Sequence, residues 1–73
     1  MKTHYKHIHF VPEMYFGDET GNWYCRTNSE QHVVIGRALK SGDFGKPAFR
    51  PSGHTEFSAG CQRDIADFLD QLK

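Results

Sequence analysis

The sequence has no net charge, few cysteines and no long run of apolar residues. Nine Lys and Arg balance nine Asp and Glu among 73 residues, and there are only two cysteines. The neutral total excludes a general attraction to polyanions, and a hydrophobic share of 37% excludes a disordered tail. No stretch approaches the ~20 apolar residues that a membrane-spanning helix needs. We therefore expect a single soluble domain over residues 1–73, with no membrane partner.

The two cysteines are far apart in the sequence. Cys25 and Cys61 form no CxxC motif, whereas a secreted protein of this size usually carries several disulfides. The first residues contain no apolar stretch typical of a signal peptide. These features predict a cytoplasmic protein with both thiols free.

Aromatic residues, in contrast, are abundant. The chain has six Phe, three Tyr and one Trp, which together make up 14% of its residues. Each large ring can bury on the order of 150–250 Å², so rings can supply a core where the chain is short. A domain of this length still buries only ~60% of its unfolded surface. We therefore expect some rings to be exposed and a homodimer to be one way of burying more apolar surface.

Glycine and proline divide the first 57 residues into short extended pieces. Pro12 would cost a ladder hydrogen bond, so the first strand either lies at a sheet edge or bends there. The run from His32 to Lys40 is the most apolar piece and is expected in the middle of the sheet. The pattern predicts strands over 5–16, 22–28, 32–40 and 47–50, a turn over 17–22, and at 54–57 a fifth strand or a continuation of the fourth.

The last part of the chain predicts one helix. It runs from about Ala59 to Leu72, with Ser58 as N-cap. Its apolar residues share one arc, which must pack on the sheet because nothing else in the chain covers it. The expected fold class is therefore α+β, with a small antiparallel sheet of four to five short strands (about 5–57) followed by one C-terminal amphipathic helix (about 59–72). The apolar arc consists of Cys61, Ile65, Phe68, Leu69 and Leu72.

Two histidines near the start of the chain are weak metal-ligand candidates. His7 and His9 form a His-x-His pair, which on a strand points both rings to one face. Cys25, His32 or Glu13 could complete a zinc site with them. The alternative is a polar face on an edge strand. The sequence favours this alternative because a zinc site needs three or four ligands, so we expect no metal and no other cofactor.

No pattern in the sequence favours an enzyme. Cys25 shares a strand face with Trp23, which is typical of a core position, and Cys61 lies on the apolar helix arc. Neither thiol then has the exposed, electropositive setting that a nucleophile needs. The grouped carboxylates lie in a turn, at Asp18-Glu19, and on the outer helix face, at Asp64, Asp67 and Asp70. Neither place has the apolar surroundings that raise a carboxyl pKa for acid–base catalysis. We expect a non-enzymatic protein with no catalytic residues.

The neutral total is a cancellation between segments. Residues 26–50 carry a net charge of +3, between −3 over 11–25 and −2 over 51–73. Cations interleaved with rings in the basic segment suit contact with an acidic protein or with a single-stranded nucleic acid. The candidate binding residues are Arg37, Lys40, Phe44, Lys46, Phe49 and Arg50.

The second half of the chain also carries a succession of features. An apolar strand from Val33 leads to a loop with Gly42, Gly45 and Pro47, then to the basic stretch 50–54, a short strand ending at Phe57 and the amphipathic helix. Over about 40 residues this order resembles the positive cofactor four type of single-stranded-DNA-binding coactivator. The resemblance implies a dimer in which a four-stranded antiparallel sheet precedes a helix. The lysine-rich surface of that family is missing from this sequence.

Together these features predict a small binding module. A binder needs only one patch of ring and arginine anchors, whereas an enzyme must hold several groups rigidly. We expect a macromolecular partner. The neutral total favours a protein, and a single-stranded nucleic acid bound by residues 26–50 is the alternative. Short chains of this kind are often accessory proteins of phage or other mobile elements, so docking on a host protein is a specific form of the hypothesis.

Overall fold

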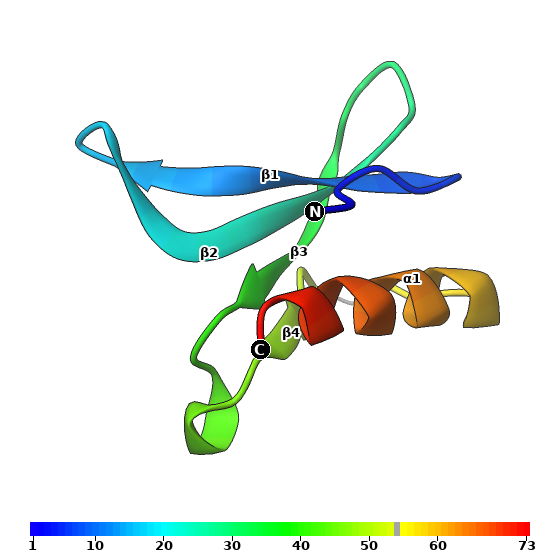
Figure 1. Ribbon diagram of the computed structural model, residues 1–73. Helices are drawn as coiled ribbons and strands as arrows, with labels where there is room; N and C mark the ends of the chain where they lie inside the picture. Colours follow the sequence, from blue (N-terminus) through cyan, green and yellow to red (C-terminus); the bar gives the residue numbers. More distant parts are fainter. Residues whose placement is uncertain (54) are drawn as a thin grey trace.

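The computed structural model describes residues 1–53 and 55–73. The strands form one antiparallel sheet in the order β1-β2-β3-β4, and the helix lies along one face of it (Figure 1). This arrangement confirms the predicted α+β fold. The elements are β1 (Ile8–Tyr15), β2 (Asp18–Thr27), β3 (Val34–Leu39), a 3-10 turn (Asp43–Gly45), β4 (Ala48–Pro51) and α1 (Ala59–Gln71).

Each strand pairs with the next one along the chain, so β2 and β3 are central and β1 and β4 are the edges. The central position predicted for the apolar run 32–40 is therefore confirmed. Pro12 lies on edge strand β1, and the pairing register shifts between Pro12 and Met14. Both predicted consequences of this proline, an edge position and an irregularity, thus occur. Residues 55–57 form no strand, and the remaining residue of the suggested fifth strand, His54, lies outside the described residues.

The turn predicted over 17–22 is wrong. β2 already begins at Asp18, and only Phe16 and Gly17 connect it to β1. Both connecting residues have positive φ, 51° and 86°, which is the backbone geometry that suits the twist of a two-residue hairpin. The polar residues that followed therefore continue the strand, and Glu19 pairs with Met14. The hairpin extends past the end of β3, and we call residues 14–20 the hairpin arm (Figure 1).

The core lies between the sheet and α1. The rings of Phe10 and Phe68 are stacked, with centroids 3.8 Å apart and planes 1° from parallel. Trp23 meets Phe68 edge-on at a centroid distance of 5.3 Å. The predicted apolar arc of the helix faces this core. Its residues Ile65 and Phe68 are buried, and Cys61, Leu69 and Leu72 are partly buried against them.

The predicted helix start is also confirmed. Ser58 is the N-cap, and its side-chain oxygen accepts a hydrogen bond from the backbone N–H of Cys61.

Both cysteines are free thiols, as expected. Cys25 is fully buried, and this burial raises its pKa to about 12, so the thiol stays neutral near pH 7.

The N-terminal segment folds along the outer edge of β1. The Phe10 N–H donates to the carbonyl of Thr3 at 2.8 Å, and the Tyr5 N–H donates to the carbonyl of Ile8 at 2.9 Å. The Tyr5 hydroxyl then donates to Asp67 of α1 at 2.8 Å. Burial, followed by the contact with Asp67, raises the pKa of Tyr5. The segment thus covers part of an exposed strand edge and ties it to the helix.

The opposite face of the sheet points away from α1, and we call it the open face. Val11, Tyr24, Arg37 and Arg50 pair in turn across the four strands, so they form one row on this face.

No helix in the described part of the chain is long and apolar enough to cross a membrane.

Candidate binding site

The structure divides the six predicted binding residues among three places. Phe49 lies on the core side, where its ring meets Phe57 edge-on at 5.6 Å, so it contributes to the fold. Arg37 and Arg50 lie opposite each other on the open face. The remaining three, Lys40, Phe44 and Lys46, belong to the loop between β3 and β4. The predicted residues therefore do not form one patch.

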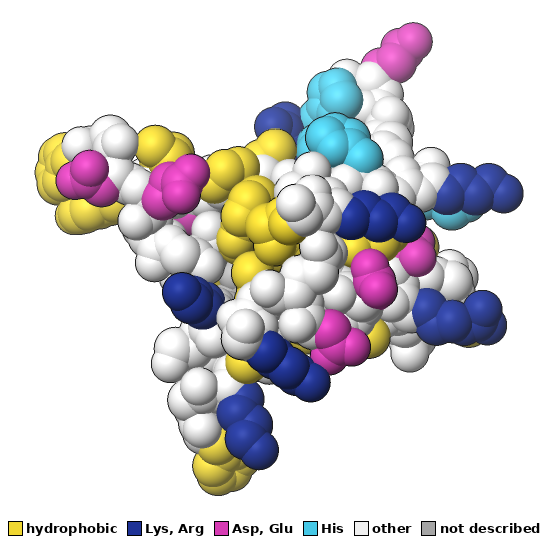
Figure 2. All heavy atoms as spheres, in the orientation of Figure 1, with side chains coloured by type: hydrophobic (Ala, Val, Ile, Leu, Met, Phe, Trp, Pro, Cys, Tyr) yellow, Lys and Arg dark blue, Asp and Glu magenta, His cyan; other side chains and the backbone are white. Residues whose placement is uncertain are grey.

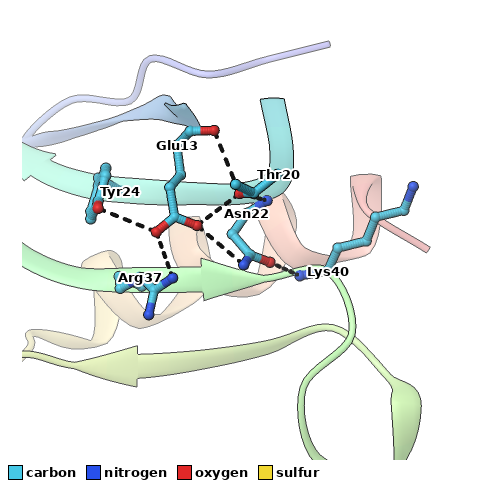
Figure 3. A network of polar contacts seen from close by, with 6 residues as sticks. All are labelled: Glu13, Thr20, Asn22, Tyr24, Arg37 and Lys40. Carbon is cyan, nitrogen blue, oxygen red and sulfur yellow. Dashed lines mark hydrogen bonds and ion pairs between the residues drawn. The ribbon is translucent and has the colours of Figure 1, made fainter. Parts of the chain in front are cut away.

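A network of side-chain contacts on the open face connects three strands (Figure 3). At its centre, the Glu13 carboxylate of β1 accepts hydrogen bonds from four side chains of β2 and β3. The donors are Thr20 Oγ1 at 2.7 Å, Asn22 Nδ2 at 3.2 Å, the Tyr24 hydroxyl at 3.2 Å and Arg37 Nη2 at 2.6 Å.

This network keeps Glu13 ionised. The hydrogen bond from Thr20 lowers the Glu13 pKa most, and Asn22, Arg37 and Tyr24 act in the same direction against the opposing effect of burial. Arg37 is therefore held by an ion pair, and its guanidinium lies 5.9 Å from the centre of the Tyr24 ring. Sequence reasoning missed the network because its members come from three strands whose register was unknown.

The Glu13 network predicts a pH-dependent effect on stability. The folded protein lowers the Glu13 pKa below its ordinary value of 4.5, so the ionised carboxylate stabilises the fold fully above that pH. This contribution is lost as the pH falls through the lower pKa of the folded state. Glu13→Gln removes the charge and places an amide N–H₂ among four donors, so Tm should fall near neutral pH. The difference from the wild type should shrink below pH 4.5.

Thermal unfolding of both proteins across this pH range checks the prediction. Glu30→Gln, an exposed acid in the loop 28–33, is the matched control and should leave Tm unchanged. A Tm difference for Glu13→Gln that stays constant with pH would contradict the proposed role of the charge.

The hairpin arm ends in three exposed apolar side chains. Met14 is 53% exposed, Tyr15 67% and Phe16 91%, and the rings of Tyr15 and Phe16 meet edge-on at 4.5 Å. The sequence predicts Phe16 only as the last residue of a strand, with no role in binding. The signal that could have identified this tip is a run of large apolar residues directly before Gly17.

The loop between β3 and β4 forms a second projection, which we call the loop arm (residues 40–47). Its tip is Phe44, which is 98% exposed and has a φ of 59°. Backbone hydrogen bonds hold the loop closed, because the Gly42 N–H donates to the Lys46 carbonyl at 2.8 Å. A Cβ on Gly42 would lie 2.5 Å from that of Ala48, so only glycine allows this tight closure.

A groove lies between the two arms and the end of α1. Figure 2 shows two projecting ends with hydrophobic side chains and a hollow between them, with dark blue (Lys, Arg) at its inner edge and magenta (Asp, Glu) on one of the ends. The main hollow measures about 550 Å³, and an adjoining one about 510 Å³ includes Trp23. Residues lining the main hollow include Thr20, Asn22, Lys40, Pro47, Leu72 and Lys73.

The Glu13 network also positions the base of the loop arm. Asn22, which donates to Glu13, accepts a hydrogen bond on its side-chain oxygen from the Lys40 N–H at 3.1 Å (Figure 3). The aliphatic part of Lys40 passes over Gly21, where an added Cβ would lie 3.5 Å from Lys40 Cδ. The base of the loop arm is thus joined, through Lys40 and Asn22, to the part of β2 that follows the hairpin arm.

The expected pairing of His7 and His9 on one strand is wrong, because β1 begins at Ile8 and leaves His7 exposed before it. The buried ring of His9 instead places Nδ1 2.7 Å from Asn28 Oδ1. Two other imidazoles contact it, His4 by stacking and His32 edge-on. Within residues 1–53 and 55–73, no group of three or more His, Cys, Asp and Glu residues is arranged to hold a metal ion.

Comparisons with known proteins give no match. No family model matches the chain, and the searches of curated proteins and of solved structures returned no match. The resemblance to the positive cofactor four type implies four antiparallel strands followed by a helix, and the structure has this order of elements.

Proposed function

We propose that this protein is a small non-enzymatic binding module that holds a protein partner between its hairpin arm and its loop arm. The observation that carries the proposal is shared by the two arm tips. Phe16 and Phe44 are 91% and 98% exposed, and their φ angles of 51° and 59° are uncommon for residues other than glycine. Such backbone persists only where the surrounding structure holds it, and it clusters at functional sites.

Exposed rings on firm supports favour binding to a protein. An aromatic ring gains a large buried area when a pocket of the partner receives it, which is why rings are frequent anchors of protein interfaces. The two-residue turn at 16–17 and the closed loop 42–46 hold the backbone that carries these rings before any partner arrives. Little backbone entropy is then lost on binding.

A single-stranded nucleic acid is the second candidate partner. The observation in its favour is the row on the open face, where Arg37 and Arg50 lie opposite each other beside Tyr24. Two features weaken it, because Arg37 is already paired with Glu13 and the ring of Phe49 lies on the core side. The protein partner remains the favoured proposal.

Removing both tip rings tests the proposal. Immobilised wild-type protein should retain a specific partner from a lysate, and the purified partner should bind it in a calorimetric titration. Phe16→Ser with Phe44→Ser should lower this affinity by roughly 30-fold or more per ring, as expected for anchors worth about 2 kcal/mol. Since both rings are exposed, circular dichroism should show an unchanged fold.

The matched control is Val33→Ser with Val34→Ser. These residues are 48% and 42% exposed and lie at the other end of the sheet, so their loss should leave the affinity unchanged. The proposal fails if the variant without tip rings binds as tightly as the wild type. Retention of a second copy of this chain as the partner would show that the arms serve a homodimer.

A further inference from the structure

The groove between the arms has a charge pattern of its own, separate from the tip rings. Lys40 and Lys73 line the main hollow, and Lys46 and Lys73 line a third, adjoining one. Lys40 begins the loop arm, Lys46 lies near its end, and Lys73 is the second residue after α1. The fold therefore gathers cations that are up to 33 positions apart in the sequence.

The lysines are available to a ligand. In the described part of the chain, no carboxylate pairs with the ammonium group of Lys40 or Lys46. Lys73 contacts Asp70 at 2.9 Å, but both side chains are about 70% exposed. Such a surface ion pair contributes little, so a ligand carboxylate can replace Asp70 at low cost.

The other residues that line the groove include apolar and acidic ones. Pro47 and Leu72 supply apolar surface to the main hollow, and Trp23 supplies it to the second one. Glu19 also lines the second hollow, and Asp70 lies beside Lys73. These carboxylates would repel the closely spaced phosphates of a nucleic acid. A peptide can place separate carboxylates at the lysines and apolar side chains between them.

We infer that the groove binds a short acidic segment of the protein partner, with its carboxylates at Lys40 and Lys46 and an apolar side chain against Pro47 and Leu72. The hollow that Lys40 lines measures about 550 Å³ and the adjoining one that Lys46 lines about 470 Å³, and each falls within the ~300–1,000 Å³ typical of small-ligand sites. The groove therefore takes a short segment, while the arms hold the remainder of the partner. This inference rests on the proposed function, because it specifies the chemistry of the partner that the arms hold.

The experiment is a selection of short random peptides, displayed on phage, against the purified full chain. We expect the wild type to enrich peptides that combine Asp or Glu with an apolar residue. Synthetic versions should change the fluorescence of Trp23, which is the single tryptophan and lines the second hollow. Lys40→Glu with Lys46→Glu should lower their affinity by about tenfold or more and should enrich basic peptides instead.

The matched control is Lys6→Glu with Arg63→Glu, which reverses the same number of charges on exposed residues, one just before β1 and one in the first half of α1. It should leave both the enrichment and the affinity unchanged. Enrichment of uncharged or basic peptides by the wild type would overturn the inference. A single-stranded oligonucleotide that binds the groove with the same dependence on Lys40 and Lys46 would overturn it as well.

The outcomes separate this inference from the proposed function. If no acidic peptide is enriched while the variant without tip rings still loses the protein partner, the groove assignment fails and the arms stand. If that variant keeps its partner, the proposed function fails first, and the inference about the partner's acidic segment fails with it.

Discussion

Replacing Phe10 with alanine is expected to lower the free energy of unfolding by about 3–5 kcal/mol, a large share of the stability of so small a protein. Its ring is 2% exposed and is stacked on Phe68 at a centroid distance of 3.8 Å. Removing a buried phenylalanine side chain costs about 3–5 kcal/mol, because apolar area is lost and a cavity remains. A chain of this length has a total stability of only about 4–11 kcal/mol. One substitution can therefore remove most of that stability.

Urea unfolding followed by Trp23 fluorescence measures this effect, since Trp23 contacts Phe68 in the same cluster. Phe44→Ala is the matched control. It removes the same side chain from a position that is 98% exposed, and it should change the free energy of unfolding by less than about 0.5 kcal/mol. Equal unfolding midpoints for the two variants would show that the stacked pair does not form the core.

Replacing Gly36 with alanine should also destabilise the protein strongly. Gly36 is buried in β3, and an added Cβ would lie 2.3 Å from Phe49 Cζ and 2.8 Å from the backbone oxygen of Arg50. The Phe49 ring can rotate only at the expense of its packing on Phe57, and the carbonyl can move only if β4 shifts. We expect a loss of about 1–3 kcal/mol in the free energy of unfolding, as for other overpacked cores.

Gly60→Ala is the matched substitution for this measurement. Its added Cβ would come no closer than 3.8 Å to the Ser58 hydroxyl, and it lies in the first turn of α1. Alanine there should stabilise the helix by roughly 0.5–1 kcal/mol. If chemical denaturation ranked Gly36→Ala as stable as Gly60→Ala, the close packing of β4 on β3 would be wrong.

The hairpin arm shows where a local sequence pattern gives a wrong prediction. The polar residues 18–22 contain the amino acids of a typical turn, yet they form a strand, because β1 offers them a pairing partner in the hairpin. The turn itself falls on Phe16 and Gly17. A phenylalanine with positive φ is unexpected from propensity, since its side chain crowds that backbone conformation.

The binding residues illustrate a second limit. Phe49 and Arg50 are neighbours on β4, so strand alternation places them on opposite faces. The prediction of one binding surface with both residues is therefore wrong for Phe49, which lies on the core side. Knowing which face is covered requires knowing where α1 packs.

The sequence by itself determined the local elements of this protein: the extended pieces, the central place of the most apolar one, and a capped amphipathic helix at the end. The spacing of apolar residues and the capping of a helix involve residues that are close in the sequence, so they can be recognised without knowing how distant segments pair. Only the tertiary structure decided which face of the sheet α1 covers, that Glu13 meets Arg37, and that two arms enclose a groove. Each of these depends on strand register, and register joins residues that lie far apart in the sequence.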